Sequence, residues 1–190
     1  MASSKVYETF PVHPGSMEIR FLELRPPFSD VLSCKLSVVT LKSGPPPFIA
    51  LSYEWGADDA NHVMSLDGHD VSIRHNLWLA LKNITKHHAR LVQDYAICID
   101  QDNIPERNHQ VDLMRDIYSS AALVLVWLGP AADDSAFAIR NIRYEKPGTG
   151  LVRKEFLAVH RLLCRTYWER MWIVQEFILG RSVLVHCGDG

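Results

Sequence analysis

The fold is indicated by a short, almost wholly apolar run, Phe48-Ile49-Ala50-Leu51-Ser52-Tyr53. It follows Pro45-Pro46-Pro47, which ends any preceding element, and it closes on Trp55-Gly56 with acidic residues just beyond. Runs of this length and composition form strands that are buried on both faces of a sheet. A polar loop at the carboxyl end of such a strand is where open α/β sheets bind their ligands.

Two further runs of the same kind follow along the chain. Residues 95–99 close on Asp100-Gln101-Asp102-Asn103, and residues 122–128 end at Gly129-Pro130. Between them, Pro105 can occupy the first position of a helix, and an apolar stripe predicts helix over residues 105–119. Strands joined by helices imply right-handed crossovers, so we predict that residues 48–53, 95–99 and 122–128 are neighbouring parallel strands.

Weaker sequence patterns predict further elements before, between and after these core strands. They predict strands at residues 18–24, 35–41 and 182–186, a hairpin around Asp67-Gly68 within residues 62–73, and helices at residues 76–84, 133–142, 152–163 and 167–179. The predicted fold class is therefore α/β, with a mainly parallel central sheet flanked by helices and additional N-terminal and C-terminal strands. We expect one domain over residues 1–190, with its core at about 48–188. A strand so close to Gly190 leads us to expect that this is the N-terminal part of a longer protein.

Composition narrows the class of function. The chain has 190 residues, of which 47% are hydrophobic, and 20 Lys+Arg against 22 Asp+Glu give a net charge of -2. Without a basic surplus, nucleic acid is not an expected partner. No run approaches the roughly 20 apolar residues of a membrane span, and no signal peptide is recognisable. Four cysteines without C-x-x-C or zinc spacing favour reduced thiols and no metal site, so we expect a cytoplasmic protein.

One acid stands out near the end of the chain. Spacings of four place Trp168, Trp172 and Glu176 on one face of the helix predicted over residues 167–179. Two tryptophans imply a buried face, and a carboxylate is unusual there because desolvation disfavours its charge. Glu176 is therefore either a functional acid or a structural one that pairs with Arg107 or Arg170 or caps a backbone amide.

A second polar group follows the strand predicted at residues 95–99. Arg107 lies near the start of a predicted helix, where backbone amides and a guanidinium together favour an anion. Asp100, Gln101 and Arg107 can thus reach the ribose or phosphates of a nucleotide, or Asp100, Asp102 and Arg107 can simply order the loop. No G-x-G-x-x-G or G-x-x-x-x-G-K-[ST] occurs, so a nucleotide site here is of neither the Rossmann nor the P-loop type.

Three blocks in fixed order resemble the heterokaryon-incompatibility (HET) domain of fungi, an intracellular cell-death module. They are residues 50–56 (ALSYEWG), 98–101 (CIDQ) with Glu106-Arg107, and 170–176 (RMWIVQE). The HET domain is in turn similar to Toll/interleukin receptor (TIR) domains, which have a flavodoxin-like fold. Ser52-Tyr53 and Trp172-x-x-x-Glu176 match the TIR strand end and its Trp-x-x-x-Glu helix.

Several TIR domains cleave NAD+ with that helical glutamate, so the resemblance implies an NAD+ nucleosidase with Glu176 as the catalytic residue. Nicotinamide leaves as a neutral molecule, and one fixed carboxylate can stabilise the cation that develops on the ribose. The substrate-binding residues that we expect are Ser52, Tyr53, Trp55, Gly56, Asp100, Gln101, Arg107 and Trp172.

The same resemblance implies NAD+ as substrate with no separate cofactor, a homo-oligomer on activation, and an upstream sensor domain or protein. The alternative is a non-enzymatic module that signals cell death by homotypic assembly. An acid at position 176 behind a tryptophan at 172 favours the enzyme, because a scaffold has no need of that pair.

Overall fold

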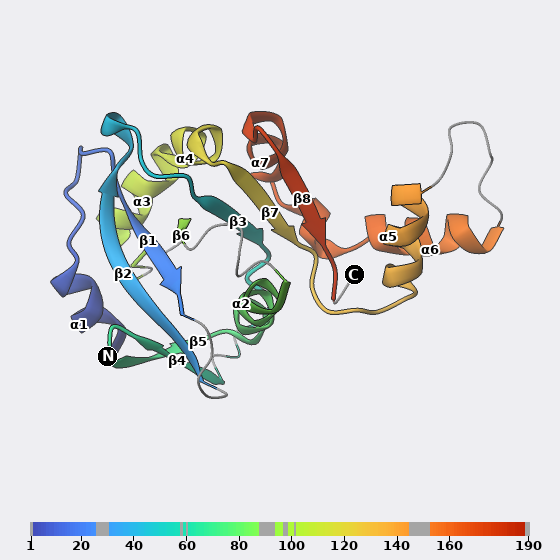
Figure 1. Ribbon diagram of the computed structural model, residues 1–190, viewed down its shortest axis with the longest axis horizontal. Helices are drawn as coiled ribbons and strands as arrows, with labels where there is room; N and C mark the ends of the chain where they lie inside the picture. The colour runs from blue at the N-terminus through green and yellow to red at the C-terminus, as the bar shows by residue number, and fades with distance from the viewer. Residues whose placement is uncertain are drawn as a thin grey trace.

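A computed structural model describes residues 2–25, 31–57, 59, 61–87, 94–96, 99–100, 102–144 and 153–188. These residues form an eight-stranded sheet in the order β5-β4-β2-β1-β6-β3-β7-β8, with helices on both sides (Figure 1). Within the described ranges, no helix is long and apolar enough to cross a membrane. The α/β class predicted from the sequence is confirmed.

Half of the sheet is parallel. It comprises β6 (Asp94–Ala96), β3 (Ile49–Tyr53), β7 (Leu123–Trp127) and β8 (Val183–His186). In this half β3 pairs in parallel with both β6 and β7, and β7 pairs in parallel with β8. The three apolar runs are thus neighbouring parallel strands, as the sequence predicts.

The other half of the sheet is mixed and built from the N-terminal strands. They are β1 (Glu18–Leu24), β2 (Leu32–Thr40), β4 (His62–Leu66) and β5 (His69–Ile73). Strand β1 joins the halves because it pairs antiparallel with both β2 and β6. The turn between β4 and β5 has φ of 48° at Asp67 and 79° at Gly68, which fits a type I′ hairpin and confirms the prediction from Asp-Gly.

Alternation along the strands creates two cores. Phe48 and Ala50 face one core, and Ile49 and Leu51 face the other. The helices are α1 (Ala2–Thr9), α2 (His75–His87), α3 (Ile104–Asp112), α4 (Met114–Ser120), α5 (Ser135–Tyr144), α6 (Arg153–Leu163) and α7 (Ile173–Leu179), with short 3₁₀ turns η1 (Leu41–Ser43) and η2 (Thr166–Glu169). Helices α1 and α2 cover the second core, and α4 to α7 cover the first.

Two predicted helices are interrupted. The helix expected over residues 105–119 is two helices, α3 and α4, which meet at the buried Leu113. The helix expected over residues 167–179 is η2 followed by α7, with Arg170 in an extended conformation between them. Trp172 is the N-cap of α7, so Trp168, Trp172 and Glu176 do not share a helix face and that prediction is wrong. The break lets Arg170 turn back toward Glu176.

Candidate functional site

The site lies at a topological switch point of the parallel strands, where the connections after two neighbouring strands go to opposite faces of the sheet. The chain after β3 leads through a hairpin to α2 on one face, and the chain after β6 leads to α3 and α4, with α4 on the other face. Crevices at such switch points bind ligands in open α/β sheets.

A cavity of ≈ 270 Å³ occupies this place. Its apolar lining comes mainly from β1, β3, α3 and α4: Ile19, Leu51, Ile99, Val111, Met114 and Ile117. Its polar and aromatic lining includes five residues predicted from the sequence, namely Tyr53, Trp55, Arg107, Trp172 and Glu176. Side chains up to 123 positions apart in sequence, Tyr53 to Glu176, therefore meet around one cavity.

The remaining predicted site residues lie differently. Ser52 is buried and does not line the cavity, although its hydroxyl donates a hydrogen bond to the carboxylate of Glu176. Gly56 and Asp100 follow the lining residues Trp55 and Ile99 in sequence but are not part of the lining themselves. Gln101 lies outside the described residues. Ser52 is thus placed to hold Glu176 rather than to touch a ligand.

Glu176 is buried, with 1% of its surface exposed, and it is surrounded by hydrogen-bond donors. Arg170 pairs with it through Nη2 at 3.0 Å from Oε1 and Nη1 at 3.4 Å from Oε2. The hydroxyls of Tyr167 and Tyr118 donate to it over 3.1 and 3.3 Å. Together with Ser52, these donors replace the water that burial removes from the carboxylate. Of the partners considered from the sequence, the structure selects Arg170.

Sequence reasoning missed the two tyrosines. Tyr118 falls in the apolar stripe that predicts the helix over residues 105–119, and such a pattern cannot show where a hydroxyl points. Burial raises the pKa of Tyr118 well above its usual value, and the charge of Glu176 adds to the effect. Burial, and then the same carboxylate, also raise the pKa of Tyr167. Both phenols therefore stay protonated donors at neutral pH, and neither serves as a base.

Trp172 and Trp55 stand at the cavity with much of their surface in solvent. Trp172 is 44% exposed, which corrects the buried face expected for it. The Arg74 guanidinium lies 5.1 Å from the centre of the Trp55 ring and donates to the carbonyl oxygen of Gly56 over 3.3 Å. Asn76 fixes the same loop through a 2.6 Å hydrogen bond to the carbonyl oxygen of Glu54. Two flat aromatic surfaces are thus presented to a ligand.

Arg107 supplies a cation at the cavity. It lies in the first turn of α3, whose N-cap is the side chain of Asn103. Its guanidinium has no hydrogen-bonding partner among the described residues. The loop network considered as an alternative forms without it, since the Asp102 amide donates to Asp100 Oδ1 over 3.2 Å and the Asp100 amide donates to Glu106. As far as the described residues show, the Arg107 guanidinium at the cavity can bind an anion.

In the part of the chain that is described, no group of three His, Cys, Asp or Glu side chains could hold a metal ion. Among the described residues, the site combines one buried carboxylate, an apolar floor, an aromatic rim and the guanidinium of Arg107, which has no hydrogen-bonding partner there. A ligand with a planar ring at one end and a phosphate at the other matches that set of groups.

Comparison with known proteins identifies the family. The model of the heterokaryon incompatibility protein (HET) family matches residues 48–176, a stretch that holds every lining residue except two on β1. The chain belongs to the HET family. It is similar to heterokaryon incompatibility protein 6, OR allele, of Neurospora crassa, with 31% identity over 237 aligned positions that cover 96% of this chain. The chain spans 35% of that relative's length. No solved structure matches it.

Proposed function

We propose that this HET domain is an NAD+ nucleosidase that acts in the cytoplasm as a cell-death effector of heterokaryon incompatibility. The observation that carries the proposal is the Glu176 carboxylate, buried among donors yet lining a cavity with aromatic and cationic groups. The name of the Neurospora crassa relative supports the biological setting. The resemblance to TIR domains supports the reaction.

In this reaction the bond between the ribose C1′ and the nicotinamide nitrogen breaks, and its electron pair leaves with nicotinamide. Positive charge develops on the ribose, and the Glu176 carboxylate stabilises it. Water then adds to C1′ and releases a proton to solvent. Nicotinamide leaves as a neutral molecule, so no general acid is needed. The raised pKa values of Tyr118 and Tyr167 make both hydroxyls poor proton donors, which is consistent with such a reaction. No separate cofactor takes part.

Ring and phosphate recognition follow from the remaining groups of the cavity. Trp172 would stack on the nicotinamide ring, with Tyr53 and Trp55 completing the aromatic wall. Arg107 would contact the diphosphate, because it combines a guanidinium at the cavity with the amides of the first turn of α3. Arg170 would limit the movement of Glu176, since it holds both carboxylate oxygens.

The test is release of nicotinamide from NAD+ by the purified chain at several protein concentrations. We expect Glu176→Gln to lower the rate about 10²–10³-fold, because a preorganised charge is lost from a largely dry site. The matched control is Glu169→Gln, the same chemical change at an exposed acid seven positions earlier. Activity that rises more steeply than protein concentration would support a homo-oligomer, formed on a signal from an upstream sensor. Absence of nicotinamide at every concentration would reject the enzyme.

A second function, homotypic assembly without catalysis, is favoured by the outer surface of α7. Val174 and Ile178, four positions apart on α7, are largely exposed, and so is Met171 in the turn just before the helix. If this surface alone carries the function, Glu176→Gln should kill fungal cells as well as the wild type does. Met171→Ser with Ile178→Ser should then abolish killing while leaving the thermal midpoint unchanged.

A further inference from the structure

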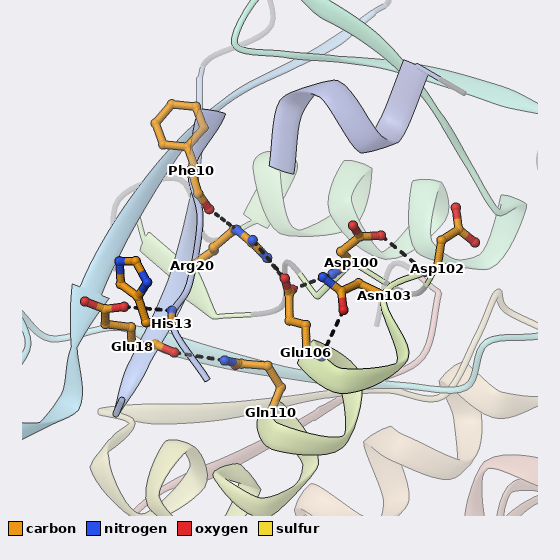
Figure 2. Close-up of polar contacts among 9 residues, drawn as sticks. All are labelled: Phe10, His13, Glu18, Arg20, Asp100, Asp102, Asn103, Glu106 and Gln110. Carbon is orange, nitrogen blue, oxygen red and sulfur yellow. Dashed lines mark hydrogen bonds and ion pairs between the residues drawn. The ribbon is translucent and has the colours of Figure 1, made fainter. Parts of the chain in front are cut away.

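A buried ion pair joins β1 to the beginning of α3. Arg20 and Glu106 are 3% and 6% exposed, and the guanidinium meets the carboxylate with two parallel contacts. Nη1 donates to Oε1, and Nη2 donates to Oε2 over 3.0 Å. Figure 2 shows Arg20 between this carboxylate and the carbonyl oxygen of Phe10, to which Nε donates over 2.6 Å. The guanidinium of Arg20 is thus fully engaged at the back of the cavity.

Glu106 extends this arrangement to the loop that follows β6. Its Oε1 also accepts a 2.8 Å hydrogen bond from the amide of Asp100, and its own amide donates to Asn103 Oδ1 over 3.1 Å (Figure 2). Glu106 therefore ties Asp100 to the first turn of α3. The next residue along that turn is Arg107, whose guanidinium has no hydrogen-bonding partner among the described residues and which lines the cavity.

The N-terminal segment holds α3 at two more points. Gln110 Nε2 donates to the carbonyl oxygen of Glu18 over 2.9 Å, and His109 Nε2 lies 2.6 Å from the carbonyl oxygen of Ser16. All three contacts come from residues before Phe48, where the family match begins. Residues outside the family's matched region thus contact α3 on both sides of Arg107 in the sequence.

Stability alone gives little reason for such a pair. Two charges lose much of their hydration on burial, and an apolar pair of similar volume often stabilises a protein equally well or better. The two-point contact does, however, fix the orientation of the two side chains relative to each other, which packing between a leucine and a methionine does not. This points to a role in geometry.

We propose that Arg20 and Glu106 are positioning residues that hold Asp100 and Arg107 in place for the diphosphate of a nucleotide ligand. We assign them a positioning role rather than a catalytic one, because both side chains are engaged with each other and Glu106 reaches the site through Asp100 and the first turn of α3. The identity of the ligand rests on the proposed function. The geometric role rests only on the contacts of Arg20, Glu106 and Asp100.

The test compares the full chain with an Arg20→Met/Glu106→Leu double variant. In the variant we expect the Asp100 amide to exchange its hydrogen at least about 10-fold faster, since a hydrogen bond to a charged acceptor is lost. The Kd for ADP-ribose and the KM for NAD+ should each rise about 10-fold, while kcat changes less than about 2-fold, because the phosphate contact is misplaced and Glu176 is not.

Two further variants separate positioning from folding. Phe21→Leu alters a buried neighbour on the same strand and should lower the thermal midpoint without changing Asp100 exchange or the Kd for ADP-ribose. Arg20→Lys keeps the charge but loses the two-point contact, so it should shift both readouts in the same direction by a smaller factor. It also provides a folded variant if the double variant does not fold.

The outcomes distinguish the two proposals. A folded double variant with a protected Asp100 amide and unchanged affinity for ADP-ribose would overturn the positioning role. Phe21→Leu reproducing the loss of affinity would also overturn it. A wild-type chain that binds ADP-ribose but releases no nicotinamide would reject the nucleosidase and leave the positioning role supported by binding and exchange.

Discussion

The ion pair between Arg170 and Glu176 permits a quantitative prediction about stability. The perturbations are Arg170→Met, Glu176→Gln and the two together. Glu176 is 1% exposed at its side chain and Arg170 is 24% exposed, so the carboxylate is dry and the guanidinium is partly in water. Removing one partner of a buried pair costs about 3–5 kcal/mol because the other charge is left without compensation.

The exposed fractions of the two side chains determine which single variant loses more folding stability. Glu176→Gln should cost about 3 kcal/mol, the lower end, because water can still solvate the quarter-exposed Arg170. Arg170→Met should cost about 3–5 kcal/mol, because it leaves a dry carboxylate with only the hydroxyls of Ser52, Tyr118 and Tyr167. The double variant should cost less than the sum by about 1.5–3 kcal/mol, since the second change removes the stranded charge.

Urea denaturation at neutral pH measures all four proteins, and the chain offers a matched control. Arg161 and Asp134 lie 3.6 Å apart at the surface, with side chains 53% and 54% exposed. The same cycle there, with Arg161→Met and Asp134→Asn, should give an interaction free energy below about 0.5 kcal/mol. If the Arg170 and Glu176 cycle is equally small, charge pairing does not stabilise this site and the reasoning is refuted.

Three further predictions concern pH, backbone and rim. Folding stability should fall as pH rises above about 10, because tyrosines in the unfolded chain ionise there while the raised pKa values of Tyr118 and Tyr167 keep both protonated in the folded chain. Urea midpoints measured at successive pH values check this, and Tyr118→Phe should make the loss of stability smaller. Gly188→Ala should lower the free energy of unfolding by roughly 1–3 kcal/mol, because φ is +60° and the new Cβ would lie 2.6 Å from that of Ala131; thermal denaturation decides it. Trp172→Ala should weaken binding of a nicotinamide nucleotide about 10-fold with little change in the thermal midpoint, since it loses ring stacking from an exposed position; unchanged affinity would contradict the stacking role.

Much of the parallel half of the fold was predictable because its signals are local. Each core strand is a short apolar run bounded by Pro, Gly or polar residues, and Asp67-Gly68 specifies its own turn. The antiparallel pairing of β1 with β6 was not predictable, since it joins segments more than 70 positions apart and leaves no local pattern. Tertiary contacts alone decide it.

The candidate site was predicted in part for a similar reason. Glu176 was selected by its spacing and by resemblance, and the structure does place it at the cavity. The spacing argument itself failed, because the chain is extended at Arg170 although neither Pro nor Gly marks a break there. Two contacts from Arg170 to the carboxylate accompany the extended conformation, and they outweigh the helical preference of the surrounding residues.

The place of β1 and β2 in the sheet sets a limit on how this domain can be shortened. They lie between the β4–β5 hairpin and the parallel strands, although in sequence they precede the family match at residue 48. A fragment cut to residues 48–176 would lose the middle of the sheet, the last strand β8 and the arginine that neutralises Glu106. It would have a detached hairpin, an unpaired strand edge prone to aggregation and a stranded buried charge. The unit that can fold is therefore larger than the unit by which the family is recognised.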